Sequence, residues 1–153
     1  MITPEVPTTS APAPKKRILL VEDEPHMMEM LKFRLLENQY EVGTATDGYA
    51  ALNQVRSFKP NLVILDLMLP KIDGYTICRL LKFNEEYRMI PVMILSARST
   101  DEDVRRGMGM GADAYMTKPY DPPALMEKIK ELLAKDMNAP PPGEETPAEA
   151  PPT

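Results

Sequence analysis

Five short apolar segments alternate with five segments of helical spacing along this chain, and that alternation constrains the fold more than any other feature. The apolar segments cover residues 17–22, 40–46, 61–66, 90–96 and 112–117, and the helical segments cover residues 25–38, 47–58, 74–83, 101–110 and 121–135. Residues 17–22, 61–65 and 91–95 are apolar nearly throughout, which is typical of strands buried on both faces of a parallel sheet. A strand followed by a helix, five times over, predicts a doubly wound α/β domain with helices on both faces of the sheet.

Polar residues occupy the carboxyl ends of four of the five predicted strands. Glu22 and Asp23 lie at the end of the first strand, Asp66 at the third, Ser96 at the fourth and Lys118 at the fifth. Sites in open α/β sheets lie at this edge, so the fold would gather several carboxylates, one hydroxyl and one ammonium in a single pocket. Crowded carboxylates repel one another, and a hard divalent cation relieves that repulsion. Oxygen ligands without a neighbouring His or Cys indicate Mg²⁺.

Asp66 is the best candidate nucleophile of such a pocket. It follows the apolar run at 62–65, where an unpaired charge would be costly to desolvate. Carboxylates can form acyl phosphates, and a metal ion and a lysine that neutralise charge during an in-line attack are the arrangement of phosphoryl transfer. We therefore expect Mg²⁺ and Lys118 to be the cations that Asp66 meets.

The motifs at these positions resemble those of response-regulator receiver domains of two-component signalling. They are "LLVEDEP", "LVILDLMLPKIDGY", "ILSAR" and "GADAYMTKPY", in this order, and the resemblance covers residues 16–135. It implies a flavodoxin-like (βα)5 domain whose five parallel strands lie in the order 2-1-3-4-5.

The resemblance also implies a role for each residue of the pocket. Asp66 would accept the phosphoryl group from a histidine kinase or a phosphotransfer protein. Glu22 and Asp23 would hold Mg²⁺ together with Asp66 and the backbone carbonyl of Met68. Lys118 would pair with Asp66 and then with the phosphoryl group, and the peptide bond after Lys118 would be cis.

Two further residues would carry the change to the surface of the domain. The resemblance implies that Ser96 is the switch hydroxyl, drawn toward the phosphate, and that Tyr115 is the switch aromatic, which turns inward. The face of the fourth helix, fifth strand and fifth helix would then change its affinity for a downstream protein target that the sequence does not identify. We therefore expect a response regulator that signals by protein contact and is not an enzyme, beyond transferring a phosphoryl group to itself and losing it again.

Two other functions stay open at this point. A binding module or scaffold could keep the receiver fold without using phosphorylation, and its partner binding would not respond to Asp66→Asn. A phosphatase with an aspartyl nucleophile would need a general acid two residues after Asp66. Met68 occupies that position and cannot transfer protons, which disfavours the phosphatase.

The charge balance and two departures from the family pattern argue against DNA binding and against a stable dimer. All 18 lysines and arginines lie within residues 15–137, where acids nearly balance them, so the basic face of a nucleic-acid-binding protein is not expected. Regulators that dimerise before binding DNA often carry acids at the positions of Ala114 and Ala124. We therefore expect a monomer or a weak dimer that makes no direct contact with DNA.

Composition divides the chain into three parts. Residues 1–14 and 138–153 are rich in proline, so we predict two disordered tails, the second of them acidic, around a receiver domain at 15–137 of the stand-alone type. No apolar run reaches the roughly 18 residues of a membrane span, so no membrane contact is expected. The single cysteine, Cys78, at a core-facing helix position, fits a reducing, cytoplasmic compartment.

Overall fold

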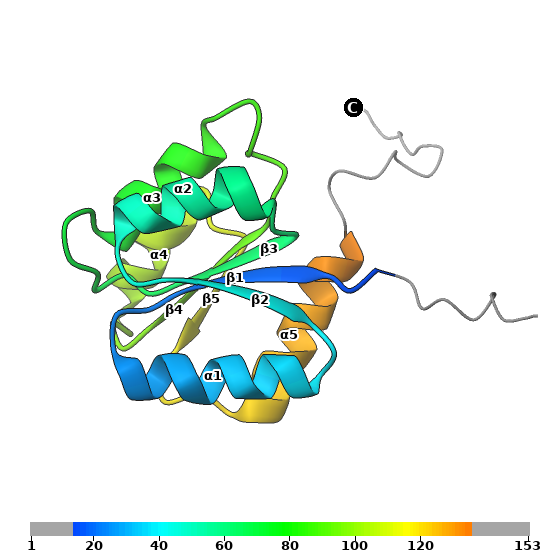
Figure 1. Ribbon diagram of the computed structural model, residues 1–153. Helices are drawn as coiled ribbons and strands as arrows, with labels where there is room; N and C mark the ends of the chain where they lie inside the picture. Colours follow the sequence, from blue (N-terminus) through cyan, green and yellow to red (C-terminus); the bar gives the residue numbers. More distant parts are fainter. Residues whose placement is uncertain (1–13, 136–153) are drawn as a thin grey trace, which may run out of the picture.

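A five-stranded parallel sheet forms the centre of the computed structural model, which describes residues 14–135 (Figure 1). The strands lie in the order β2-β1-β3-β4-β5. They are β1 (Arg17–Val21), β2 (Glu41–Ala45), β3 (Leu62–Leu65), β4 (Val92–Ser96) and β5 (Ala114–Thr117). The helices are α1 (Pro25–Glu37), α2 (Gly48–Phe58), α3 (Gly74–Lys82), α4 (Asp101–Gly109) and α5 (Pro122–Lys135). The predicted α/β class and the predicted strand order are both confirmed.

Helices cover both faces of this sheet. α1 and α5 lie on one face, and α2, α3 and α4 lie on the other (Figure 1). The side chains of β3 alternate between the two layers: Leu62 and Ile64 pack with the core under α1 and α5, whereas Val63 and Leu65 pack with the core under the other three helices. All four residues of β3 are buried, which explains why the run at 62–65 is apolar without a break.

Several elements are shorter at their ends than the sequence pattern predicted. The helix predicted from Asp47 begins one residue later, because the Asp47 carboxylate caps it by accepting the backbone N–H of Ala50 over 2.9 Å. The strand predicted from Ile90 begins at Val92, directly after Pro91. A proline has no N–H to donate to a sheet, so it stands outside the strand.

A buried ion pair connects the end of α3 to the start of β5. The Nζ atom of Lys82 lies 2.9 Å from Oδ2 of Asp113, and the two side chains are only 12% and 16% exposed. The same ammonium donates to the carbonyl oxygen of Ile90 (3.0 Å), and the same carboxylate accepts the N–H of Val92 (2.8 Å). The pair therefore fixes α3 against the beginnings of β4 and β5.

Replacing Asp113 by Ala is expected to lower the free energy of unfolding by about 2–4 kcal/mol, because it leaves the Lys82 ammonium buried without a carboxylate. Unfolding in guanidinium chloride, followed by circular dichroism, measures this loss. Glu131→Ala is the control: it breaks the exposed Lys128–Glu131 pair on α5 and should leave the stability nearly unchanged. Equal losses in the two variants would contradict this account of the buried pair.

Cys78 on α3 is fully buried, as the sequence predicted, and burial raises the pKa of its thiol to about 11. We expect iodoacetamide at pH 8 to label the folded protein at least about a hundredfold more slowly than the protein in guanidinium chloride, because little thiolate forms and the sulfur is covered. The raised pKa contributes stability that is complete below about pH 9 and is lost as the pH rises through about 11. Rapid labelling of every molecule under native conditions would show that α3 opens readily.

Two predictions concern residues that the structure does not describe. The tails, except for Pro14, lie outside residues 14–135, and so do the last two residues of the predicted domain at 15–137. None of the helices described has the length and apolar character that crossing a bilayer requires.

Candidate functional site

Three polar side chains are buried within residues 14–135, and all three lie at the carboxyl edge of the sheet. Glu22, Asp66 and Ser96 are 5%, 7% and 0% exposed. They lie at the ends of β1, β3 and β4, which are neighbours in the sheet. Parallel strands bring their carboxyl ends to one edge, so the fold brings these three predicted site residues to the same place.

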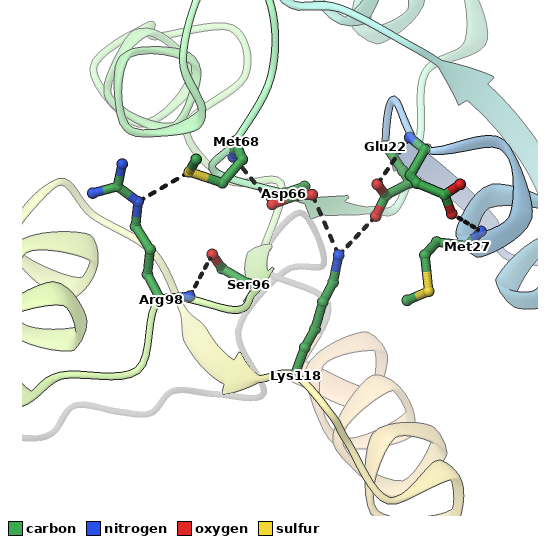
Figure 2. A network of polar contacts seen from close by, with 8 residues as sticks. Glu22, Met27, Asp66, Met68, Ser96, Arg98 and Lys118 are labelled. Carbon is green, nitrogen blue, oxygen red and sulfur yellow. Dashed lines mark hydrogen bonds and ion pairs between the residues drawn. The ribbon is translucent and has the colours of Figure 1, made fainter.

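Lys118 follows β5 and extends between two carboxylates at this edge, as Figure 2 shows. Its Nζ atom lies 3.0 Å from Oε1 of Glu22 and 3.3 Å from Oδ2 of Asp66. The peptide bond between Lys118 and Pro119 is cis, as the resemblance implied. One ammonium therefore faces two buried carboxylates, which leaves an excess of negative charge.

The pKa values of this cluster follow from burial and from the shared lysine. Desolvation raises the pKa of Glu22, and the hydrogen bonds that it accepts from Lys118 and from the N–H of Glu24 oppose this shift without cancelling it. Burial by itself would lower the pKa of Lys118, but Glu22 and Asp66 outweigh that effect and raise it. Lys118 therefore stays charged at neutral pH, and the charged form of Glu22 is held at a desolvation cost.

Asp23 completes a cluster of three acids. One carboxylate oxygen of each of Glu22, Asp23 and Asp66 lies within 4.8 Å of the others, and Asp23 is exposed whereas the other two are buried. The donors are all carboxylate oxygens, the ligand type that Mg²⁺ prefers in proteins. An excess of negative charge that opens to solvent on one side, with oxygen donors only, fits a bound Mg²⁺ ion.

The backbone fixes the Asp66 carboxylate. The N–H of Asp66 donates to the carbonyl oxygen of Val21 over 3.1 Å, which extends the pairing of β1 with β3. The N–H of Met68 donates to Oδ1 of Asp66 over 3.1 Å, so Oδ1 is bound to the backbone while Oδ2 faces Lys118 (Figure 2). The role of the Met68 carbonyl as a metal ligand stays a prediction.

Ser96 and Tyr115 both contact the loop between β4 and α4. The Oγ atom of Ser96 accepts the N–H of Arg98 over 3.1 Å, and the Tyr115 hydroxyl donates to the carbonyl oxygen of Arg98 over 2.7 Å. The Arg98 side chain in turn donates to the sulfur of Met68 over 3.1 Å (Figure 2). The Tyr115 ring packs against Gly107 of α4, where a Cβ atom would stand 2.9 Å from it. The two residues predicted to act as a switch therefore share one loop residue, and their movement stays a prediction.

Reasoning from the sequence missed Gly74, the first residue of α3. A Cβ atom at this position would stand 2.5 Å from the carbonyl oxygen of Asp66 and 2.6 Å from the Cα atom of Leu67. The N–H of Gly74 also donates to the carbonyl oxygen of Leu67 over 3.1 Å. The chain after Asp66 therefore packs directly on the start of α3. The only signal in the sequence is a glycine after Asp73, the N-cap residue of that helix.

Several curated relatives of similar sequence are named as transcriptional regulators. The chain is 38% identical over 129 residues to the alkaline phosphatase synthesis transcriptional regulatory protein PhoP of Bacillus subtilis (strain 168), a match that covers 84% of this chain and 53% of that protein. It is 36% identical over 124 residues to the DNA-binding dual master transcriptional regulator RpaA of Synechocystis sp. (strain ATCC 27184 / PCC 6803 / Kazusa). This match covers 81% of this chain and 52% of RpaA. The chain spans about half the length of these relatives.

These relatives overturn the expectation that the protein makes no direct contact with DNA. That expectation rested on the near-neutral charge of residues 15–137 and on the missing acids at Ala114 and Ala124, but RpaA is named as a DNA-binding protein and PhoP as a transcriptional regulator. The charge balance of a domain that matches about half of such proteins does not report what the whole proteins bind. The expectation of no DNA contact was therefore wrong.

A family model and a solved structure identify the domain itself. The model for the response regulator receiver domain matches residues 18–130, from β1 into α5, and so includes every strand and the acidic cluster. The crystal structure of a putative response regulator from Chloroflexus aurantiacus J-10-fl superposes with a TM-score of 0.76 and 33% sequence identity, over 79% of this chain and 99% of that one. The chain therefore belongs to the family of response regulator receiver domains.

Proposed function

We propose that Asp66 accepts a phosphoryl group from a histidine kinase or a phosphotransfer protein, and that the domain signals by protein contacts that depend on this phosphorylation. The observation that carries the proposal is the setting of the Asp66 carboxylate. It is 7% exposed, one of its oxygens lies 3.3 Å from the Lys118 ammonium, and it shares a cluster with Glu22 and Asp23. A nucleophile and the groups that would balance the incoming charge thus lie together.

A carboxylate oxygen of Asp66 would attack the phosphorus atom of a phosphohistidine on the donor protein. The new O–P bond forms as the P–N bond breaks, and the imidazole nitrogen of the donor keeps the electron pair and takes up a proton. The Lys118 ammonium lies beside Oδ2 of Asp66 and would pair with the transferred group. Mg²⁺, held by Glu22, Asp23, Asp66 and the Met68 carbonyl, would supply further neutralisation of the phosphoryl oxygens.

Ser96 and Tyr115 would transmit the change. The phosphoryl group offers new acceptor oxygens near Ser96, whose Oγ atom now accepts the N–H of Arg98. Movement of Ser96 would pull on the loop that also holds the Tyr115 hydroxyl, and Tyr115 packs against Gly107 of α4. The phosphorylated and free forms would then differ in contacts made at α4, which is what a shift in partner affinity requires.

The same proposal makes the domain a stoichiometric acceptor and not an enzyme that turns over a substrate, because Met68 stands where a phosphatase of this type would carry its general acid. The names of the relatives suggest transcription as the process that the signal controls. A cytoplasmic location is also proposed, since the one cysteine is a buried free thiol.

Intact-mass spectrometry after incubation with acetyl phosphate and Mg²⁺ tests this function. The expected result is a gain of one phosphoryl group that maps to the peptide containing Asp66 and that disappears when Mg²⁺ is chelated. No gain in a protein shown by circular dichroism to be folded would favour a binding module that keeps the pocket without using phosphorylation. Turnover of a small phosphoester would instead indicate a phosphatase.

Replacing Lys118 by Ala is expected to leave phosphorylation of Asp66 detectable. Ser96 and Tyr115 should then no longer move in response to it. The variant keeps the Asp66 nucleophile but loses the ammonium that would bind the phosphoryl group, so the group would not be held where the switch residues can respond. The amide NMR signals of Arg98 and Tyr115, recorded with and without acetyl phosphate, measure the response.

The control for this prediction is Lys128→Ala, which removes an ammonium from an exposed pair on α5. It should show the same phosphate-dependent shifts as the unmodified protein. If the phosphorylated Lys118→Ala variant shows those shifts as well, the proposed role of Lys118 in the switch is wrong.

A further inference from the structure

A groove outside the acidic site runs between α3 and α4, which lie on the same face of the sheet (Figure 1). Its volume is about 640 Å³. The residues that matter for its chemistry are Tyr75, Arg79, Leu80, Phe83, Arg106 and Met110. None of them takes part in the proposed phosphorylation, so the groove is a separate candidate binding site.

Two arginines in the groove lie near aromatic rings, and one of them is stacked. The Cζ atom of Arg106 lies 4.2 Å from the centroid of the Tyr75 ring, and that of Arg79 lies 5.8 Å from the centroid of the Phe83 ring. Stacking orients a planar guanidinium while leaving the N–H groups at its edge free for a bidentate acceptor. The Arg106 guanidinium is therefore oriented by a buried ring before any ligand arrives, whereas Arg79 lies near an exposed ring.

These arginines have no acidic partner in the structure. Neither forms an ion pair with a carboxylate anywhere in residues 14–135. The described residues that line the groove include these two cations and no acid. The groove thus carries a local positive charge in a chain whose formal net charge is −5, and it is complementary to an acidic ligand.

Large apolar side chains at the same groove are exposed. Phe83 is 74% exposed and Leu80 is 48% exposed, although both belong to the aromatic and aliphatic classes that usually pack inside. The base of the groove is well packed, because Tyr75 is 5% exposed and its hydroxyl donates to the carbonyl oxygen of Asp103 on α4 over 3.3 Å. An apolar patch beside unpaired cations is typical of a surface that binds another protein.

We propose that the α3–α4 groove binds an acidic peptide segment of a partner protein. An apolar side chain of the segment would cover Leu80 and Phe83, and flanking carboxylates would bind Arg79 and Arg106 in bidentate fashion. A nucleotide or another small anion fits less well, because small-molecule sites enclose most of their ligand, whereas Phe83 stands 74% exposed and needs an extended partner to cover it. This docking does not require phosphorylation of Asp66 and adds a second interaction surface to the domain.

Selection from a library of random displayed peptides tests the proposal. The full chain serves as the bait, and peptides that also bind an Arg79→Gln/Arg106→Gln double variant are removed in each round. Survivors are synthesised with a fluorescent label, and their Kd values are measured by fluorescence anisotropy. The changed side chains are exposed, so the variants should fold, and thermal unfolding checks this.

We expect the surviving peptides to combine Asp or Glu with a large apolar residue. Arg79→Gln and Arg106→Gln should each weaken their binding roughly tenfold, and Phe83→Ser should weaken it as well. Arg105→Gln, at an exposed position of α4 that does not line the groove, is the matched control and should bind like the unmodified protein. The proposal is wrong if no peptide survives the counter-selection, if survivors lack acids, or if Arg105→Gln weakens binding as much as Arg106→Gln. An NMR titration in which ATP shifts the signals of Phe83 and Arg106, with no peptide selected, would overturn it in favour of a phosphate ligand.

Discussion

Asp66→Asn is expected to reduce phosphorylation by acetyl phosphate to background, while the domain stays folded. An amide has no anionic oxygen to attack phosphorus, so no stable acyl phosphate can form at this position. The change is nearly isosteric, and the amide oxygen can still accept the N–H of Met68 that now binds Oδ1 of Asp66. Lys118 keeps Glu22 as a partner at 3.0 Å, so its ammonium is not left without a counter-charge. Intact-mass spectrometry with acetyl phosphate and Mg²⁺ measures the loss.

The control for this experiment is Asp73→Asn, which makes the same chemical change outside the acidic cluster. Asp73 caps α3 by accepting the N–H of Thr76 over 3.0 Å, and asparagine is an equally good N-cap residue. This variant should be phosphorylated to the same extent as the unmodified protein. A phosphoryl group that persists in the Asp66→Asn variant would mean that the acceptor is another residue, and peptide mapping would then distinguish Asp23 from Glu22.

Gly74→Ala is expected to lower the free energy of unfolding by about 3 kcal/mol, at the upper end of the usual cost of overpacking. The added Cβ atom would stand 2.5 Å from the carbonyl oxygen of Asp66 and 2.6 Å from the Cα atom of Leu67. These are backbone atoms of the segment that holds the phosphoacceptor, so they cannot move aside by rotating a side chain. For a domain of this size the loss corresponds to a decrease in Tm of about 10 °C. Phosphorylation at a temperature where the variant is folded should also slow down, because the Asp66 carboxylate is displaced from Lys118.

Gly109→Ala is the matched control for this prediction. Gly109 is the last residue of α4, and a Cβ atom there would meet nothing within 4 Å. Because alanine restricts the unfolded chain more than glycine, this variant should be as stable as the unmodified protein or more stable by up to about 1 kcal/mol. A Gly74→Ala variant with unchanged Tm would show that the Asp66 segment can shift at little cost, and the packing argument would fail.

The sequence predicted the fold well because its signals are local. The apolar run at 62–65 marks a strand that is covered on both faces, and Asp47 marks the start of a helix through a cap that depends on a residue three positions away. The ends of several elements were predicted one or two residues away from where they lie. The strand predicted from Ile90 starts at Val92, because Pro91 has no N–H to donate to a neighbouring strand.

The candidate site was predictable for a related reason. In a parallel sheet, every strand delivers its last residues to one edge, so listing the residues at strand ends was enough to find Glu22, Asp66, Ser96 and Lys118. Near-neutral charge, by contrast, was a poor guide to partners, since it describes one domain, and the match to that domain covers only about half of each relative.

By itself, then, the sequence determined the alternation of strands and helices and the chemical types at the sheet edge. Only the tertiary structure decided which of these groups meet. Lys118 lies 96 residues from Glu22 along the chain yet 3.0 Å from it in space, and Gly74 touches the backbone of Asp66. In the groove between α3 and α4, Arg106 stacks on Tyr75, a residue of a different helix. Such contacts depend on how packed elements are placed against one another, and residue type and spacing along a chain do not specify that placement.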